Sequence, residues 1–245
     1  MSWMNNRSSC LLPARSLTVV GWLLIPLYLL VLAALYGAFL YAPTEKIMGE
    51  VQRIFYFHVA AAWNSFVAFF GVFVGGVGYL VTRKKFWDSL AAASAEVGVL
   101  FTTIVLITGP IWAKPVWNTW WPWADPRLMT ELVLWLIYVA YLILRSGLSE
   151  GDKKYRYCAV FGIIGFLDVP LVWFSIRWWR TIHPVVITSS GAALEPRMMQ
   201  ALMISTASFM VLYLTLVLLR LSMRLDSTLT EELEQRTLHK KVVKL

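Results

Sequence analysis

The sequence is poor in charge, cysteine and histidine. Only 15% of its 245 residues are charged, whereas a soluble domain carries about 25%, so the composition excludes a water-exposed globular protein. The two cysteines, Cys10 and Cys158, form no Cys-x-x-Cys pair, which excludes the usual cysteine-based zinc and redox motifs. Histidine occurs three times, so rarely that each one can be considered individually.

Apolar residues, by contrast, make up 59% of the chain and form long runs. An apolar run of about 18 residues is typical of a transmembrane helix. Six such runs are present: Leu17–Tyr41, Ile54–Thr82, Leu90–Trp112, Leu128–Leu144, Tyr155–Ile176 and Met198–Leu219. The sequence therefore predicts an all-α polytopic membrane protein with six transmembrane helices. We expect a membrane domain over residues 1–219 and a helix-compatible cytoplasmic tail over residues 220–245.

The basic residues predict the orientation of these helices. Fifteen lysines and arginines lie in the termini and in the second and fourth connections, against seven in the other three connections. Basic residues accumulate on the cytoplasmic side of membrane proteins, so both termini are expected there. They are dispersed between apolar runs, which argues against nucleic-acid binding in spite of a net charge of +8. The outer connections are then 42–53, 113–127 and 177–197.

The second of these outer connections is rich in tryptophan. Five tryptophans fall within twelve residues, namely Trp112, Trp117, Trp120, Trp121 and Trp123. One interpretation is the aromatic belt that membrane proteins place at the lipid headgroups. That belt distributes tryptophan over many helix ends, whereas this segment concentrates it between prolines. The pattern therefore favours a flat aromatic platform beside an apolar planar ligand.

Two of the three histidines fall on the same side as this loop. His58 lies about one turn inside the second run and His183 lies in the last outer connection, while His239 lies among lysines of the tail. A lone interfacial histidine is commonly a hydrogen-bonding group, but two beside an aromatic platform suit the axial ligands of heme iron. Arginines near them could pair with the heme propionates or simply flank the helices. They are Arg53, Arg127, Arg177 and Arg180.

Three segments resemble a known family. Residues 48–59 (MGEVQRIFYFHV), 112–127 and 178–183 (WWRTIH) are similar to the heme exporter protein C (CcmC) family of bacterial cytochrome c maturation. This family belongs to the heme-handling superfamily with a tryptophan-rich WWD domain, which also contains CcmF and CcsA. One departure is Ala124, which separates Trp123 from Asp125 where the family usually has Trp-Asp.

The resemblance implies a heme-binding protein of the bacterial inner membrane with its site facing the periplasm. It implies non-covalent protoheme IX held by His58 and His183 on the five-tryptophan platform, with Asp125 contributing to the loop. The implied partners are the heme chaperone CcmE, which receives the heme, the small protein CcmD and the CcmA–CcmB ABC transporter. The expected function is heme delivery without a catalytic residue, rather than ordinary enzymatic turnover.

Two other classes of membrane protein remain as alternatives. A b-type cytochrome subunit would also use two histidines, but such subunits bury them within the bilayer. A secondary transporter would have repeated halves or paired broken helices, and neither is evident. Glu96 and Asp168 lie inside apolar runs, where charge is costly. Glu96 is expected to be protonated or to pair with the basic residues 83–85. Asp168 lies near a kink expected at Pro170, and its position is as consistent with a structural role there as with a functional one.

Overall fold

The computed structural model describes residues 7–179, 181–183, 187–188, 191–192 and 194–242. Helices make up nearly all of the described chain. The elements are α1 (Arg7–Tyr36), the π-helical turn η2 (Gly37–Tyr41), the 3₁₀ turn η3 (Glu50–Gln52), α2 (Arg53–Thr82), α3 (Lys85–Trp117), α4 (Pro126–Gly147), α5 (Asp152–Phe166), α6 (Asp168–Trp178), β1 (Ile187–Thr188), β2 (Gly191–Ala192) and α7 (Pro196–Val242). The two short strands pair antiparallel, with Ile187 opposite Ala192.

Six helical segments of the described chain are long and apolar enough to cross a membrane, which confirms the predicted six-span fold. They are Thr18–Tyr41, Glu50–Thr82, Lys85–Trp117, Pro126–Gly147, Asp152–Trp178 and Pro196–Leu225. Five of the six predicted runs lie inside an observed span, and the first begins one residue before its span, at Leu17. The last span continues without a break into the tail, because α7 is one helix of 47 residues.

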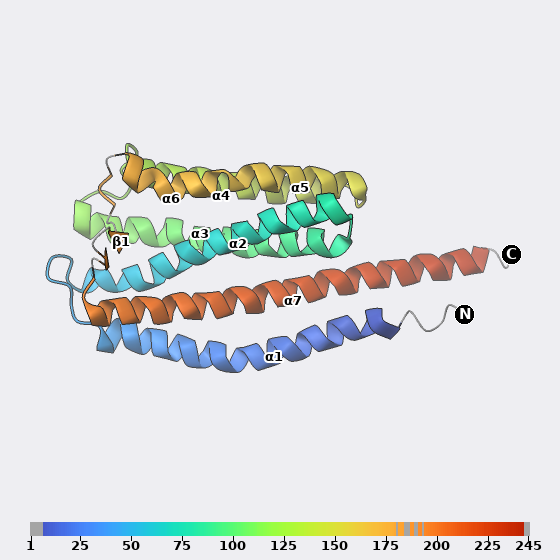
Figure 1. The fold of residues 1–245 in the computed structure, drawn as a ribbon, viewed down its shortest axis with the longest axis horizontal. Coiled ribbons are helices and arrows are strands. Elements are labelled where there is room, and N and C mark those ends of the chain that lie inside the picture. Colours follow the sequence, from blue (N-terminus) through green and yellow to red (C-terminus); the bar gives the residue numbers. More distant parts are fainter. Residues whose placement is uncertain (1–6, 180, 184–186, 189–190, 193, 243–245) are drawn as a thin grey trace.

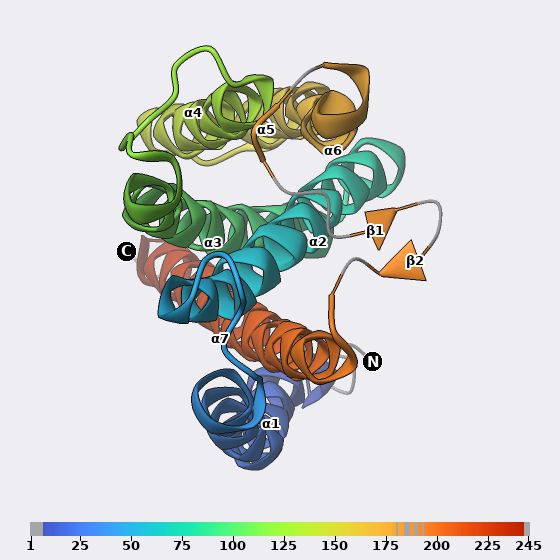
Figure 2. The same cartoon turned by 90° about the vertical axis from the view of Figure 1, so that its left-hand side faces the viewer.

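The helices run side by side along the long axis of the molecule (Figure 1). Helices α2 and α3 pack closely against each other, with α7 against both of them and α1 against α7. Figure 2 shows α4, α5 and α6 together on the other side of the α2–α3 pair. Helix α1 begins at the same end of the bundle as α7 finishes, and the connection between α3 and α4 lies at the opposite end.

Two helix boundaries differ from the apolar runs. Helix α3 continues past Trp112 to Trp117, although it contains Pro110 and Pro115, so part of the predicted loop is helical. It ends at Asn118, whose positive φ of 55° is tolerated by asparagine and is a common way to close a helix. The fifth span is divided into α5 and α6 at Leu167.

The break in the fifth span places Pro170 in the first turn of α6, beginning at Asp168. The first four backbone N–H groups of a helix have no intrahelical acceptor, so proline costs no hydrogen bond there. Asp168 occupies the first position of that turn, where a carboxylate is favourable to the helix dipole. The expected kink is thus realised as the start of a new helix.

Small residues and ion pairs hold the bundle together. A Cβ atom added to Gly75 would lie 2.7 Å from the carbonyl oxygen of Trp87, so glycine is what permits the close approach of α2 and α3. Asp88 of α3 and Arg145 of α4 form a buried, two-point ion pair. Glu96 pairs with Arg220 and Arg224 of α7, partners that the sequence did not indicate.

Candidate functional site

A pocket opens at the end of the bundle that carries the α3–α4 connection. The space between its walls is about 470 Å³, a value that includes the open mouth. Its walls come from α2, α3, α4, the tryptophan loop and the segment after α6. Most of the lining side chains are apolar or aromatic; the polar and charged ones are His58, His183, Arg127 and Glu131.

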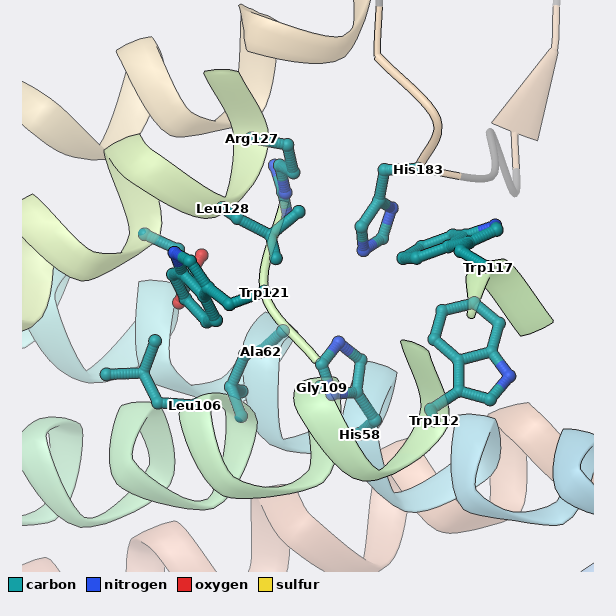
Figure 3. A pocket seen from close by; sticks show the side chains of 12 residues that line it. His58, Ala62, Leu106, Gly109, Trp112, Trp117, Trp121, Arg127, Leu128 and His183 are labelled. Carbon is teal, nitrogen blue, oxygen red and sulfur yellow. The ribbon is translucent and has the colours of Figure 1, made fainter. Parts of the chain in front are cut away.

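The two histidines face each other across this pocket (Figure 3). Their ring centroids are 6.3 Å apart and the rings are inclined by 32°. His58 is buried in the second turn of α2, and its Nδ1 lies 2.9 Å from the Thr108 hydroxyl of α3. His183 is half-buried in the connection after α6. His58 and His183 thus come together from distant parts of the chain, the first on a helix and the second in a connection.

Three of the five loop tryptophans line the pocket, and two do not. Trp112, Trp117 and Trp121 belong to its walls, with Trp112 and Trp117 on one side of the histidines and Trp121 on the other (Figure 3). Trp120 is 60% exposed and Trp123 is 71% exposed, and neither is among the lining residues. The dense cluster therefore has two faces, of which one builds the pocket.

Trp112 lies at the centre of the aromatic contacts. Its ring centroid is 6.2 Å from that of His58, 6.1 Å from that of His183 and 5.4 Å from that of Trp117. Phe55 contacts it from α2 at 6.3 Å. The side chain is 1% exposed, and its Nε1 has no hydrogen-bond partner among the described residues. Trp112 thus packs beside both imidazoles and fixes one wall of the pocket.

The four arginines predicted to pair with propionates have different environments. Arg127 lines the pocket; its Nη1 donates to the carbonyl of Val172 at 2.5 Å, and its guanidinium lies 5.7 Å from the ring centroid of Phe66. Arg53 pairs with Glu50 and donates to the carbonyl of Ala38 at 2.5 Å. Arg177 is exposed. Arg53 and Arg177 are not among the lining residues, and Arg180 lies outside the described residues.

Asp125 connects the tryptophan loop to the segment that carries His183. Its Oδ1 accepts the backbone N–H groups of Arg127 and Leu128 at 3.0 and 3.2 Å, so it is the N-cap of α4, followed by Pro126 in the favoured first position. Its Oδ2 accepts the Thr181 hydroxyl at 2.5 Å and the Ile182 N–H at 3.0 Å. The carboxylate, buried and multiply hydrogen-bonded, lies between two parts of the site in spite of the preceding Ala124.

Sequence reasoning missed two polar residues of the site. Thr108 contacts His58 from α3, and nothing in its sequence context separates it from other threonines of the apolar run. Glu131 lines the pocket one turn after Arg127; it is 4% exposed, and neither carboxylate oxygen has a hydrogen-bond partner among the described residues. An acidic residue inside an apolar run is itself a signal of a functional site.

The arrangement suits one kind of chemistry. Two neutral imidazoles opposed across a gap can bind one metal centre from both sides. Indole walls favour a flat apolar molecule around that centre, and Arg127 provides a cation for an anionic substituent.

The chain is similar to proteins of one family over most of its length. The family model described as heme exporter protein C matches residues 5–237. Heme exporter protein C of Escherichia coli K12 is 33% identical over 215 residues, covering 86% of each chain. That of Bradyrhizobium diazoefficiens is 31% identical over 205 residues, covering 83% of this chain and 77% of the relative. A putative cytochrome c biosynthesis ccmC-like mitochondrial protein of Marchantia polymorpha is 33% identical over 180 residues, covering 73% and 76%. The chain belongs to the heme exporter protein C family.

Proposed function

We propose that this protein holds heme between His58 and His183 and delivers it to the heme chaperone CcmE during maturation of c-type cytochromes. Heme is the cargo in this proposal, and the protein performs no covalent chemistry on it. The observation that carries the proposal is the opposed pair of imidazoles in an aromatic pocket. The family name, heme exporter protein C, supports the same ligand.

The spacing of the histidines fits a metal centre between them. An imidazole nitrogen binds a transition metal at about 2 Å and lies about 1 Å from its own ring centre, so two axial rings are about 6 Å apart. The observed separation of the ring centroids is 6.3 Å. Zinc would need further protein ligands, usually four in total, whereas a porphyrin supplies four nitrogens itself. The residues present therefore fit heme.

The rest of the pocket fits the periphery of protoheme IX. Trp112, Trp117 and Trp121 supply flat walls for the macrocycle, and Arg127 is placed to pair with a propionate through the N–H groups that it does not donate to Val172. Binding is non-covalent in this proposal, because the chain has no Cys-x-x-Cys-His segment of the kind that attaches heme through thioethers. Arg53, Arg177 and Arg180 remain the proposal's candidates for the second propionate.

The charge distribution supports the placement of the pocket on the periplasmic side of the bacterial inner membrane. The basic connections around residues 83–85 and 145–156 lie at the end of the bundle where α1 begins, and basic residues favour the cytoplasm. The pocket is at the other end. On the periplasmic side it would be accessible to CcmE, with CcmD and the CcmA–CcmB transporter as further partners in the membrane.

The visible spectrum of the purified protein tests heme binding. Wild-type protein reconstituted with heme should give a six-coordinate, low-spin spectrum, and His58→Ala and His183→Ala should each abolish that spectrum. His239→Ala is the matched control, because His239 lies in the tail, and it should leave the spectrum unchanged. A wild-type protein without a low-spin spectrum, or two pocket variants that retain it, would refute the ligand assignment.

Delivery can be separated from electron transfer, the function of a b-type cytochrome subunit. The heme of a delivery protein should appear on purified apo-CcmE when the two proteins are mixed, and deletion of the gene should abolish holo-CcmE while quinol oxidation by membranes continues. Loss of quinol oxidation with normal holo-CcmE would favour the cytochrome. The location of His183 outside the transmembrane helices supports delivery.

A further inference from the structure

The two histidines of the pocket are held by different means. His58 belongs to the regular helix α2, which packs along α3 and α7. His183 belongs to the connection that follows α6, and it is held through hydrogen bonds to the neighbouring loop. Movement of His58 would require the helix packing around α2 to separate. Movement of His183 requires only the hydrogen bonds of its connection to break.

The contact with Thr108 fixes the ring of His58. The Thr108 hydroxyl carries one hydrogen and lies 2.7 Å from the carbonyl oxygen of Ile104, one turn earlier on α3, to which it donates. It therefore accepts from His58 Nδ1 at 2.9 Å, so the proton of the neutral imidazole is on Nδ1. The lone pair is then on Nε2, the nitrogen available to a metal, and a hydrogen bond of this type also sets ring orientation.

The position of His183 depends on Asp125 and Thr181. The Thr181 hydroxyl donates to Asp125 Oδ2 at 2.5 Å and accepts the backbone N–H of His183 at 3.0 Å. The same carboxylate oxygen accepts the N–H of Ile182 at 3.0 Å. A short chain of hydrogen bonds thus runs from the first residue before α4 to the backbone of the histidine; we refer to Asp125, Thr181 and Ile182 as the latch.

The latch is connected to an exposed part of the molecule. The backbone N–H of Asp125 donates to the carbonyl of Pro122 at 2.9 Å, closing a tight turn that contains Trp123. Trp123 and Trp120 are the exposed tryptophans of this loop and do not line the pocket. A protein that binds Trp123 and shifts this turn therefore acts directly on the hydrogen bond of Asp125 to Pro122.

We propose that His183, released by opening of the latch, is the ligand that leaves first at hand-over, and that His58 stays bound to the cargo until the acceptor's ligand is in place. Thr108 is the positioning residue for His58, and Asp125 and Thr181 are the positioning residues for His183. In the exchange, His183 keeps the electron pair of its iron–nitrogen bond and an electron pair of the acceptor's donor atom takes its place, so no oxidation or reduction is needed. The inference rests on the proposed function.

The rate of heme loss tests this asymmetry. Heme-loaded protein in detergent is mixed with an excess of apomyoglobin, and transfer is followed in the visible spectrum. Thr181→Val removes the latch hydroxyl at nearly constant volume and should accelerate transfer about tenfold, the factor that corresponds to 1.4 kcal/mol. Thr181→Ser retains the hydroxyl and should behave as wild type, which excludes a folding defect at this position as the cause.

A titration with free imidazole identifies which of the two histidines has left the iron. Free imidazole should replace His183 in Thr181→Val at a concentration about tenfold lower than in wild type, with a low-spin spectrum retained. Thr108→Val should instead weaken heme binding and alter the low-spin spectrum without sensitising the protein to imidazole. Thr102→Val is the matched control, because Thr102 makes the same hydrogen bond to the preceding turn of α3, to Gly98 at 2.8 Å, and does not line the pocket.

The outcomes separate this inference from the proposed function. If wild-type protein gives no low-spin heme spectrum, the proposed function fails. If wild type binds heme as expected but Thr181→Val releases it at the wild-type rate, only the latch fails. If Thr108→Val releases heme as fast as Thr181→Val and is equally sensitive to imidazole, the two ligands are equivalent and the order of release is refuted.

Discussion

Replacement of Trp112 by alanine is expected to destabilise the protein strongly, because this side chain is the centre of the aromatic contacts of the pocket. It is 1% exposed and its ring lies within 6.3 Å, centroid to centroid, of four other rings. Truncation of a buried tryptophan costs about 3–5 kcal/mol, since both the contacts and the packing around the cavity are lost. The Nε1 has no protein partner among the described residues, so the cost arises from packing alone.

Trp123→Ala is the matched control for this variant. Trp123 lies in the same connection but is 71% exposed, so its truncation should change the free energy of unfolding by less than about 0.5 kcal/mol. Unfolding of both variants is followed by circular dichroism during titration of mixed detergent micelles with sodium dodecyl sulfate. Trp112→Phe restores a ring without the indole N–H and should recover more than half of the loss.

The comparison can refute the division of the tryptophans into two faces. Equal losses of stability in Trp112→Ala and Trp123→Ala would show that exposure does not determine their roles. A Trp112→Phe variant as unstable as Trp112→Ala would show that the indole N–H is needed, which contradicts the argument from packing.

Three further variants test the bundle and the pocket. Asp88→Asn leaves the buried Arg145 guanidinium without its anionic partner and should cost about 3–5 kcal/mol in the same titration; an additional Arg145→Met should recover most of it, and no recovery would contradict this. Gly75→Ala places a methyl group 2.7 Å from a backbone carbonyl of α3 and should cost about 1–3 kcal/mol, unlike Gly147→Ala, which meets no atom within 4 Å. Glu131→Gln neutralises a buried carboxyl that has no hydrogen-bond partner in the described chain and should raise the melting temperature of the heme-free protein; a lower melting temperature would contradict this.

The helices were predictable because the membrane imposes their length and composition. A lipid environment requires every backbone polar group to be paired within its own helix, so an apolar run of about 20 residues has few alternatives to a spanning helix. The ends of the helices were less predictable. Helix α3 continues beyond the apolar run as far as Trp117. In these last turns, helical hydrogen bonding and the packing of Trp112 in a buried cluster outweigh the cost of Pro115.

The site was predictable in outline and not in geometry. Topology placed His58, His183 and the tryptophans on one side of the membrane, but the distance between the imidazoles depends on the path of a connection that no periodic pattern describes. Tryptophan suits both a packed wall and an exposed interface, so composition could not separate Trp112 from Trp123. Thr108 resembles Thr102 and Thr103 in sequence, and only the packing of α2 on α3 shows which of them meets the histidine.

In the proposed hand-over, the placement of the two histidines explains how one pocket could both retain and release heme. If both histidines lay on packed helices, withdrawal of either would separate surfaces as close as Gly75 and Trp87, at the cost of many contacts at once. Withdrawal of His183 instead requires the hydrogen bonds of Asp125 to Thr181 and Ile182 to break, each worth about 0.5–1.5 kcal/mol. The binding energy of a docking protein can supply that amount without disturbing the bundle. His58 is buried in α2 and bonded to Thr108, so in this proposal it keeps the heme oriented until the acceptor's own ligand is in place.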